Sequence, residues 1–359
     1  MKKYFISILL TASAVTLNAQ KMENPNINTS LAPIENLQLT QEWDKVCPKS
    51  DEVDHKKVTF VNRYGITLAA DMYIPKNISG KMPAIAVSGP FGAVKEQSSG
   101  LYAQQLAERG FLTIAFDPSF TGESGGEPRR VASPDINTED FSAAVDFLSV
   151  QENVDPERIG ILGVCGWGGI AIQAAINDPR IKATVASTMY DMTRVHANGY
   201  NDSEDTAEMR NAKRKAIADL RTENYRTGKY GRDGGVIDPL PDNAPQFVKE
   251  YHDYYKTPRG FHPLSGNSTD GWNTTGLAAF INFKFFEYAE ELESAVMIAH
   301  GENAHSLYFG EDTFKKLKGD NKELLIIGDA NHTDLYDNLE KIPFDQIAVF
   351  FKRWMNVNE

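Results

Sequence analysis

The chain of 359 residues is short of several features that define whole classes of protein. It has only two cysteines, Cys47 and Cys165, too few for a scaffold that depends on disulfide bonds. Acidic residues outnumber basic ones, 49 to 37, and the formal net charge of −12 argues against binding to nucleic-acid phosphates. No segment approaches the roughly 20 consecutive apolar residues that a membrane-spanning helix needs. These shortages exclude disulfide-rich scaffolds, nucleic-acid-binding proteins and proteins that span a membrane.

The first residues have the three parts of a secretory signal peptide. Lys2 and Lys3 form the basic start, residues 6–15 the apolar stretch, and residues 17–19 (Leu-Asn-Ala) a cleavage site. The sequence therefore predicts a signal peptide over residues 1–19 and a mature protein that is periplasmic or secreted.

The next segment, residues 20–56, is polar and has no clear period, which predicts an N-terminal arm. Cys47 lies in this arm, too far from the cleavage site to carry a lipid anchor. An exported chain permits a disulfide between Cys47 and Cys165, but Cys165 belongs to a motif that explains it without a bridge. We therefore expect both thiols to be free.

From residue 57 onward, short apolar runs alternate with helix-like segments. Residues 58–61 and 66–69 flank a turn-forming segment and predict a hairpin. Further strands are expected at 83–87, 111–116, 159–163 and 183–187, and helices at about 100–109, 139–150 and 168–177. Short continuous apolar strands that alternate with helices are typical of a parallel sheet covered on both faces.

This alternation stops near Met192 and resumes after residue 290. Residues 193–290 are helix-rich, charged and aromatic, whereas strands are expected again at 295–299 and 324–327, before a final helix at 344–354. We therefore predict an α/β core made of residues 57–192 and 291–359. A helical lid over 193–290 is inserted after the sixth strand of this mostly parallel, doubly wound sheet.

A cysteine between glycines, at the end of an apolar run, is the main candidate for catalysis. The segment 163–169 reads Gly-Val-Cys-Gly-Trp-Gly-Gly and follows the run 159–162 (Ile-Gly-Ile-Leu). Glycines there allow a sharp strand-to-helix turn that exposes Cys165, with the N–H groups of the following residues directed at whatever the sulfur attacks. This layout predicts nucleophilic acyl transfer by Cys165, assisted by a histidine and a helix N-terminus that favour the thiolate.

Among the seven histidines, only His332 follows a predicted strand near the C-terminus. A nucleophile followed by a late histidine is the chain order of α/β-hydrolases, and His332 would take the thiol proton and return it to the leaving group. Glu302 is the candidate for the acid that orients His332, and Asp191, after the sixth strand, is the alternative. The histidines form neither an HExxH motif nor a Cys/His cluster, so no metal site is expected.

The loop after the third predicted strand is expected to complete an oxyanion hole. It contributes the N–H of Phe91, which joins the N–H of Gly166, and each such donor is worth about 3 kcal/mol in the transition state. Trp167 and His305 are candidates for contact with the substrate, Trp167 because it adjoins the elbow and His305 because it lies at the same rim.

Several motifs together resemble the dienelactone-hydrolase-like branch of the α/β-hydrolase superfamily, the subgroup with a Gly-x-Cys-x-x-Gly-Gly elbow. The segments that carry the resemblance are 92–97, 116–129, 154–160, 163–169, 301–306 and 330–337. The resemblance covers about residue 57 to the C-terminus and implies a Cys-His-acid hydrolase with a helical lid and no cofactor. Two positions depart from the family pattern. Trp167 stands where a small residue is usual, and Ala304 stands where the acid is expected.

These observations predict an exported hydrolase that cleaves an ester, a lactone or a thioester of a small-molecule acyl substrate. A peptidase or amidase acting on short peptides is the alternative among enzymes. A binding protein on an eroded hydrolase scaffold is the alternative outside them, because the expected aspartate is missing.

Overall fold

A computed structural model of the chain describes residues 34–76, 78 and 80–357. The predicted signal peptide, residues 1–19, and the first part of the predicted N-terminal arm lie outside the described residues. Among the described residues, no helix is both long and apolar enough to cross a membrane.

The core of the described chain is an eight-stranded sheet in the order β1-β2-β4-β3-β5-β6-β9-β10. From β4 to β10 all neighbouring strands are parallel, whereas β2 runs antiparallel to both β1 and β4. The predicted hairpin and the predicted mostly parallel sheet are both confirmed. The strands are β1 (Val53–Val61), β2 (Thr67–Pro75), β3 (Met82–Ser88), β4 (Leu112–Phe116), β5 (Val154–Val164), β6 (Ala183–Ser187), β9 (Ala295–Gly301) and β10 (Lys322–Ile327).

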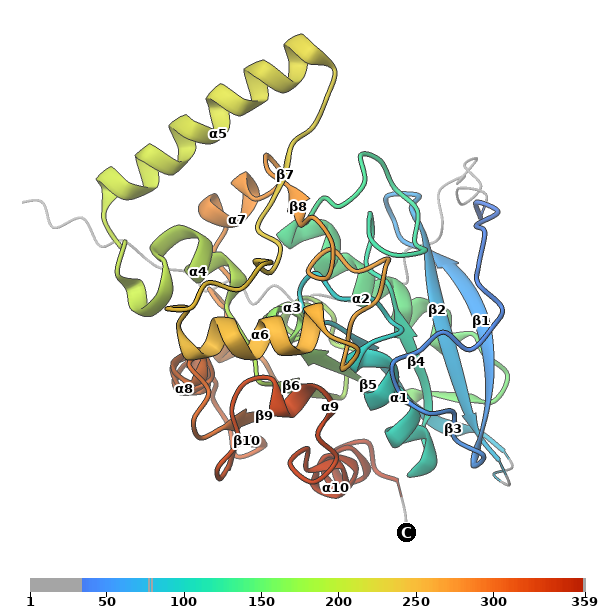
Figure 1. Cartoon of the computed structure of the whole chain (residues 1–359). Coiled ribbons are helices and arrows are strands. Elements are labelled where there is room, and N and C mark those ends of the chain that lie inside the picture. The colour runs from blue at the N-terminus through green and yellow to red at the C-terminus, as the bar shows by residue number, and fades with distance from the viewer. Residues whose placement is uncertain (1–33, 77, 79, 358–359) are drawn as a thin grey trace, which may run out of the picture. The chain divides into compact units, whose positions relative to one another are not determined.

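Helices cover both faces of this sheet, which explains why its central strands are continuous apolar runs (Figure 1). One face is covered by α1 and α10, which contact each other, and the other by α2 and α3. A further helix, α8, packs on β9 and β10. The bounds are α1 (Ser98–Glu108), α2 (Pro134–Ser149), α3 (Gly166–Asn177), α8 (Leu307–Lys316), α9 (Asp334–Asp337) and α10 (Phe344–Trp354).

The segment between β6 and β9, for which the sequence predicts a lid, contains helices and one short two-stranded sheet. Its elements are α4 (Met192–Asn198), η1 (Tyr200–Asp202), α5 (Ala207–Thr227), β7 (Arg232–Asp233), α6 (Gln246–Lys256), β8 (Trp272–Asn273), α7 (Ala278–Asn282) and η2 (Ala289–Glu291). The helix α5 buries none of its residues and projects from the rest of the segment, whereas α6 lies close to α9 (Figure 1). The pairing of β7 with β8 was not predicted.

The described part of the N-terminal arm is held against the sheet. Trp43 Nε1 donates a hydrogen bond to the carbonyl of Cys47, and Lys45 forms an ion pair of 3.0 Å with Asp71 on β2. The first strand begins at Val53 and so takes in the end of the segment predicted as an arm. Both cysteines are free and buried.

Candidate active site

Cys165 lies at a sharp turn between β5 and α3, in the backbone conformation that a nucleophile elbow requires. Its φ of 58° and ψ of −128° lie in a region that costs a non-glycine residue energy and is concentrated at functional sites. The turn depends on its glycines. A Cβ at Gly163 would lie 2.0 Å from the carbonyl oxygen of Trp167, and one at Gly169 would lie 2.2 Å from that of Tyr190. The chain can turn sharply here because these glycines leave room for the backbone segments to approach each other closely.

The thiol of Cys165 faces the two backbone donors that the sequence predicts for an oxyanion hole. Burial raises the pKa of this thiol, while the nearby hydroxyl groups of Tyr336 and Tyr251 and the N–H groups of Gly166 and Phe91 act in the opposite direction. The side chain is thus a neutral thiol at rest, with N–H groups in place to hold an anion. The structure brings Cys165, Phe91 and Gly166 together.

The loop that carries Phe91 is fixed by the segment between β6 and β9. Asn267 donates a side-chain hydrogen bond to the carbonyl of Phe91, and its backbone N–H donates to the carbonyl of Gly92 at 3.0 Å. Ser265 Oγ donates to the same Gly92 carbonyl at 2.7 Å. The position of the Phe91 N–H therefore depends on this segment as well as on β3.

His332 lies in the loop between β10 and α9, fully buried, and is surrounded by hydroxyl groups. Its Nδ1 lies 2.6 Å from Ser306 Oγ and 2.9 Å from Thr188 Oγ1, and its Nε2 lies 3.1 Å from the hydroxyl oxygen of Tyr336. Burial lowers the pKa of His332 well below 6.5, and His305 and His300 lower it further. The imidazole is therefore neutral at physiological pH and is available as a base.

Neither of the carboxylates predicted to orient His332 is bonded to it. Glu302 is exposed and its Oε2 accepts a hydrogen bond of 3.2 Å from the N–H of Asp329. Asp191 caps α4, where its Oδ1 accepts from Thr193 and Arg194. The structure thus departs from the predicted triad, since hydroxyl groups occupy the place expected for the acid. The reason is local, because Ala304 has no carboxylate and Ser306, two positions later, contacts Nδ1 instead.

Trp167 is not at the substrate pocket, contrary to the expectation from its place in the elbow. Its ring is 1% exposed and packs edge-on against Phe116 and Phe141, at centroid distances of 6.1 and 5.7 Å. The side chain of the second residue of α3 points into the layer between the sheet and α2, so a large ring fills the core there.

His305 is half-buried beside the site and contacts it through tyrosines. Its Nε2 is hydrogen-bonded to the hydroxyl of Tyr190 and lies 3.5 Å from that of Tyr251, and its ring stacks on Phe247. Burial lowers the pKa of His305 to about 4. It therefore supports two tyrosines at the pocket rather than lining the pocket itself.

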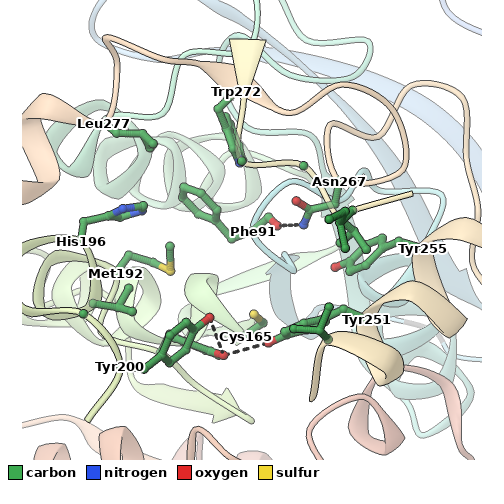
Figure 2. A pocket seen from close by; sticks show the side chains of 18 of the residues that line it. Phe91, Cys165, Met192, His196, Tyr200, Tyr251, Tyr255, Asn267, Trp272 and Leu277 are labelled. Carbon is green, nitrogen blue, oxygen red and sulfur yellow. Dashed lines mark hydrogen bonds between the residues drawn. The ribbon is translucent and has the colours of Figure 1, made fainter. Parts of the chain in front are cut away.

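The sulfur of Cys165 opens on a pocket of about 640 Å³ that is built largely by the segment between β6 and β9 (Figure 2). Figure 2 shows Phe91 and Met192 on one side of Cys165, with Tyr200 and Tyr251 flanking it. The apolar and aromatic lining residues are Phe91, Tyr190, Met192, Val195, Tyr200, Val236, Ile237, Val248, Tyr251, Tyr255, Trp272, Leu277 and Tyr336. A concave, mostly apolar site with a few polar groups is the usual form of a small-molecule site.

Carboxylates are scarce in this lining. Glu204 is the only lining carboxylate among the described residues, and its Oε2 lies 2.6 Å from Lys213 Nζ. No group of three or more His, Cys, Asp or Glu side chains suited to a metal ion occurs in the described part of the chain.

The sequence analysis missed Tyr336, Ser306 and Thr188 as members of the site. One signal for Tyr336 was present, because it follows His332 by four positions, the spacing that places two side chains on one face of a helical turn. Ser306 and Thr188 gave no signal of this kind.

Comparison with known proteins places the chain among hydrolases. The profile of the family described as X-Pro dipeptidyl-peptidase (S15 family) matches residues 64–334. The chain is 56% identical over 317 residues to the uncharacterized protein PA2218 of Pseudomonas aeruginosa, covering 88% of this chain and 85% of the relative. The crystal structure of PA2218 superposes with a TM-score of 0.87 at 54% identity, over 89% of this chain and 99% of that chain.

Two proteins that are less similar to this chain have names that describe an enzyme. The thiohydrolase aneE of Aspergillus aculeatus is 34% identical over 137 residues, which covers 38% of this chain and 42% of that protein. The α/β-hydrolase GrgF from a Penicillium species has a TM-score of 0.69 at 20% identity, over 84% of this chain and 99% of that chain, and shows the fold alone.

Proposed function

Since the chain belongs to the X-Pro dipeptidyl-peptidase (S15) family and is a hydrolase of the α/β fold, we propose that it cleaves an ester, lactone or thioester through an acyl intermediate on Cys165. The observation that carries this proposal is the thiol of Cys165 held at a strained turn against the N–H groups of Phe91 and Gly166. That pair of donors suits the oxyanion of a tetrahedral intermediate.

The reaction follows from the groups at the site. Cys165 Sγ attacks the substrate carbonyl while His332 accepts the thiol proton, and the new oxyanion is bound by the two N–H groups. Collapse of the intermediate expels an alkoxide or thiolate, which takes the proton back from His332. Water, deprotonated by the same histidine, then releases the acyl group from Cys165.

The pocket favours acyl substrates over free peptides. An aminopeptidase must pair the ammonium of its substrate with a carboxylate, because a buried unpaired charge is costly. The lining residues offer only Glu204, which is already paired with Lys213. The intermediate of a peptide would also expel the thiolate more readily than an unprotonated amine. The thiohydrolase among the relatives supports the same preference for thioesters.

The second candidate is peptide cleavage, and the family match favours it. The two functions are separated by assaying the purified mature protein on p-nitrophenyl esters, on acyl thioesters and on an Xaa-Pro p-nitroanilide. We expect turnover of esters and thioesters, an acyl adduct on Cys165 by mass spectrometry, and loss of both in Cys165→Ala. Turnover of the anilide alone would establish the peptidase instead. A labelled thiol without any turnover would favour a binding protein.

We also propose that the enzyme is exported. The support is the basic start, the apolar stretch and the cleavage site over residues 1–19. Cell fractionation with mass spectrometry of the mature N-terminus tests this, and the expected first residue is Gln20. A cytoplasmic protein that retains residues 1–19 would contradict it.

A further inference from the structure

Tyr336 lies between the two groups that the proposed reaction joins. Its hydroxyl oxygen is 3.1 Å from His332 Nε2, and the same hydroxyl lies near enough to Cys165 to lower the pKa of that thiol against the effect of burial. Tyr336 and Cys165 both line the pocket, whereas His332 does not. In the described part of the chain, no hydrogen bond joins Cys165 directly to His332. Tyr336 therefore lies beside the thiol in the pocket and contacts the imidazole, which offers a path between the two groups.

The place of Tyr336 is fixed by packing. It is fully buried on α9, and its ring contacts the edges of Tyr254, Tyr255 and His332 at centroid distances of 4.9, 6.1 and 5.3 Å. Such a ring has no room to swing aside and let His332 reach the sulfur.

The hydroxyl groups on the far side of His332 match this arrangement. With its proton on Nδ1, the imidazole donates to Ser306 Oγ or Thr188 Oγ1 and leaves the Nε2 lone pair toward Tyr336. Tyr336 then donates its proton to Nε2, and its oxygen keeps a lone pair that can accept a proton from Cys165.

Resting on the function proposed above, we propose that Tyr336 is a catalytic residue that relays the proton between Cys165 and His332. As Sγ bonds to the carbonyl carbon, its proton passes to the Tyr336 oxygen while the phenolic proton passes to His332 Nε2. The electron pair of the carbonyl π bond moves to the oxygen held by Phe91 and Gly166. When the leaving group departs with the electron pair of its bond, it takes the proton from the Tyr336 oxygen, and that oxygen regains a proton from His332 Nε2.

The two transfers are concerted. Burial raises the pKa of Tyr336 well above 10, and the nearby thiol adds to this effect. A free tyrosinate is therefore not formed on the path at neutral pH, and the tyrosine releases its own proton only as it gains another.

The test compares Tyr336→Phe with Tyr254→Phe. Both changes remove one buried phenolic oxygen from the same cluster, but the hydroxyl of Tyr254 has no hydrogen-bond partner among the side chains of the site. We expect Tyr336→Phe to lower the rate of Cys165 acylation by about 100-fold or more, the range of general acid–base contributions, with KM little changed. Tyr254→Phe should keep the rate within about threefold. Equal rates for the wild type and a folded Tyr336→Phe would overturn the relay.

A second measurement needs no variant. The acylation rate of the wild-type enzyme in mixtures of H2O and D2O should follow a curved proton inventory, because two protons move in one step. A linear inventory, the result for one proton, would show that His332 takes the proton directly. If no ester or thioester reacts, alkylation of Cys165 by iodoacetamide still reports on the tyrosine. Tyr336→Phe should then shift the pH dependence of this alkylation to higher pH. An unchanged pH dependence would refute the contact between Tyr336 and Cys165, and it would say nothing about whether the protein transfers acyl groups.

Discussion

Two buried polar regions of this protein differ in their side chains, which are charged in one region and neutral in the other. The ionic cluster beneath β1 and β2 consists of charged side chains, namely Lys45, Lys57, Asp71, Lys95, Glu96, Asp117 and Glu123. The hydroxyl cluster around Cys165 and His332 consists of neutral groups, namely Thr188, Tyr190, Tyr251, Ser306 and Tyr336. Only the second contains the groups of the proposed reaction and lines the pocket.

The ionic cluster fixes segments that are distant in the sequence. Lys95 Nζ lies 2.8 Å from Asp117 Oδ2 and 2.7 Å from Glu123 Oε2, and its backbone N–H also donates to Asp117. These contacts join the loop after β3, which carries Phe91, to the loop after β4. Full charges at short distance hold atoms in place, because moving either partner leaves a buried charge exposed to a low dielectric.

The hydroxyl cluster has the opposite property. A neutral thiol, phenol and imidazole carry no charge before the reaction starts, so the resting site does not have to bury an isolated charge, which is expensive. Charged groups thus join distant segments of the scaffold, whereas the groups of the proposed reaction are neutral at rest.

The largest expected effect comes from breaking the ionic cluster at its centre. Lys95→Met leaves Asp117 and Glu123 buried without their shared cation, so we expect the free energy of unfolding to fall by about 3–5 kcal/mol. Urea denaturation followed by circular dichroism measures this. Lys215→Met is the matched control, because Lys215 pairs with Asp219 on the exposed face of α5 and its loss should leave the midpoint unchanged. Equal midpoints for the two variants would show that the ionic cluster is not stabilising.

The next effect tests whether the hydroxyl cluster tolerates a charge. Ser306→Asp puts a carboxylate near His332 Nδ1, which should raise the pKa of His332 because a nearby negative charge favours the imidazolium. A base loses activity as the pH falls through its pKa. The wild type, in which that pKa is well below 6.5, should keep its kcat/KM on the acid side, and the variant should lose it at a higher pH.

Ser306→Asn is the control for this change, since it has the size of aspartate without the charge. The pH dependence of kcat/KM on a p-nitrophenyl ester separates the variants. If Asp and Asn variants share one profile, the charge does not reach His332 and the proposed orientation of its ring is wrong.

The sequence predicted the scaffold well for a physical reason. Strands buried on both faces, such as β3 and β6, have to be continuous apolar runs, and a nucleophile between a strand and a helix needs the glycines at 163 and 169. The strands β7 and β8 have two residues each, too short to show any period, so their pairing could not be predicted.

The partners of His332 were harder to predict. Thr188 and Ser306 follow two different strands, β6 and β9, and serines and threonines are common in loops, so nothing in their local sequence distinguishes them. The ionic cluster was missed for a related reason. Its members come from five segments, and a charged residue in a sequence is ordinarily read as a surface residue.

A smaller effect is expected from the acid titration of the ionic cluster. Burial alone would raise the pKa of Glu123, but Lys95 and Lys57 outweigh it and lower that pKa to about 2. An acid with a lowered pKa in the folded state binds its proton more weakly than in the unfolded chain. Its contribution to stability is therefore complete above the unfolded pKa of about 4.5 and is lost as the pH falls toward 2.

Urea midpoints measured through this range should decline for the wild type. Glu123→Gln should be less stable at neutral pH and should decline less steeply, because the titrating group is gone. Parallel curves for the two proteins would assign the acid sensitivity to other carboxylates.

The smallest effect is expected where the sequence alone pointed to a catalytic acid. Glu302→Gln removes a carboxylate that is exposed and bonded to the N–H of Asp329, with no bond to His332. We expect kcat/KM to stay within about twofold of the wild type at every pH, since an exposed charge is screened by water and the ring is held by Ser306 and Thr188. The steady-state kinetics of Glu302→Gln should be compared with those of Ser306→Ala, because Ser306→Ala removes the shorter of the two contacts to His332 Nδ1. A fall of 100-fold or more in Glu302→Gln alone would mean that the carboxylate reaches His332 during turnover, and the neutral hydroxyl cluster would then describe only the resting enzyme.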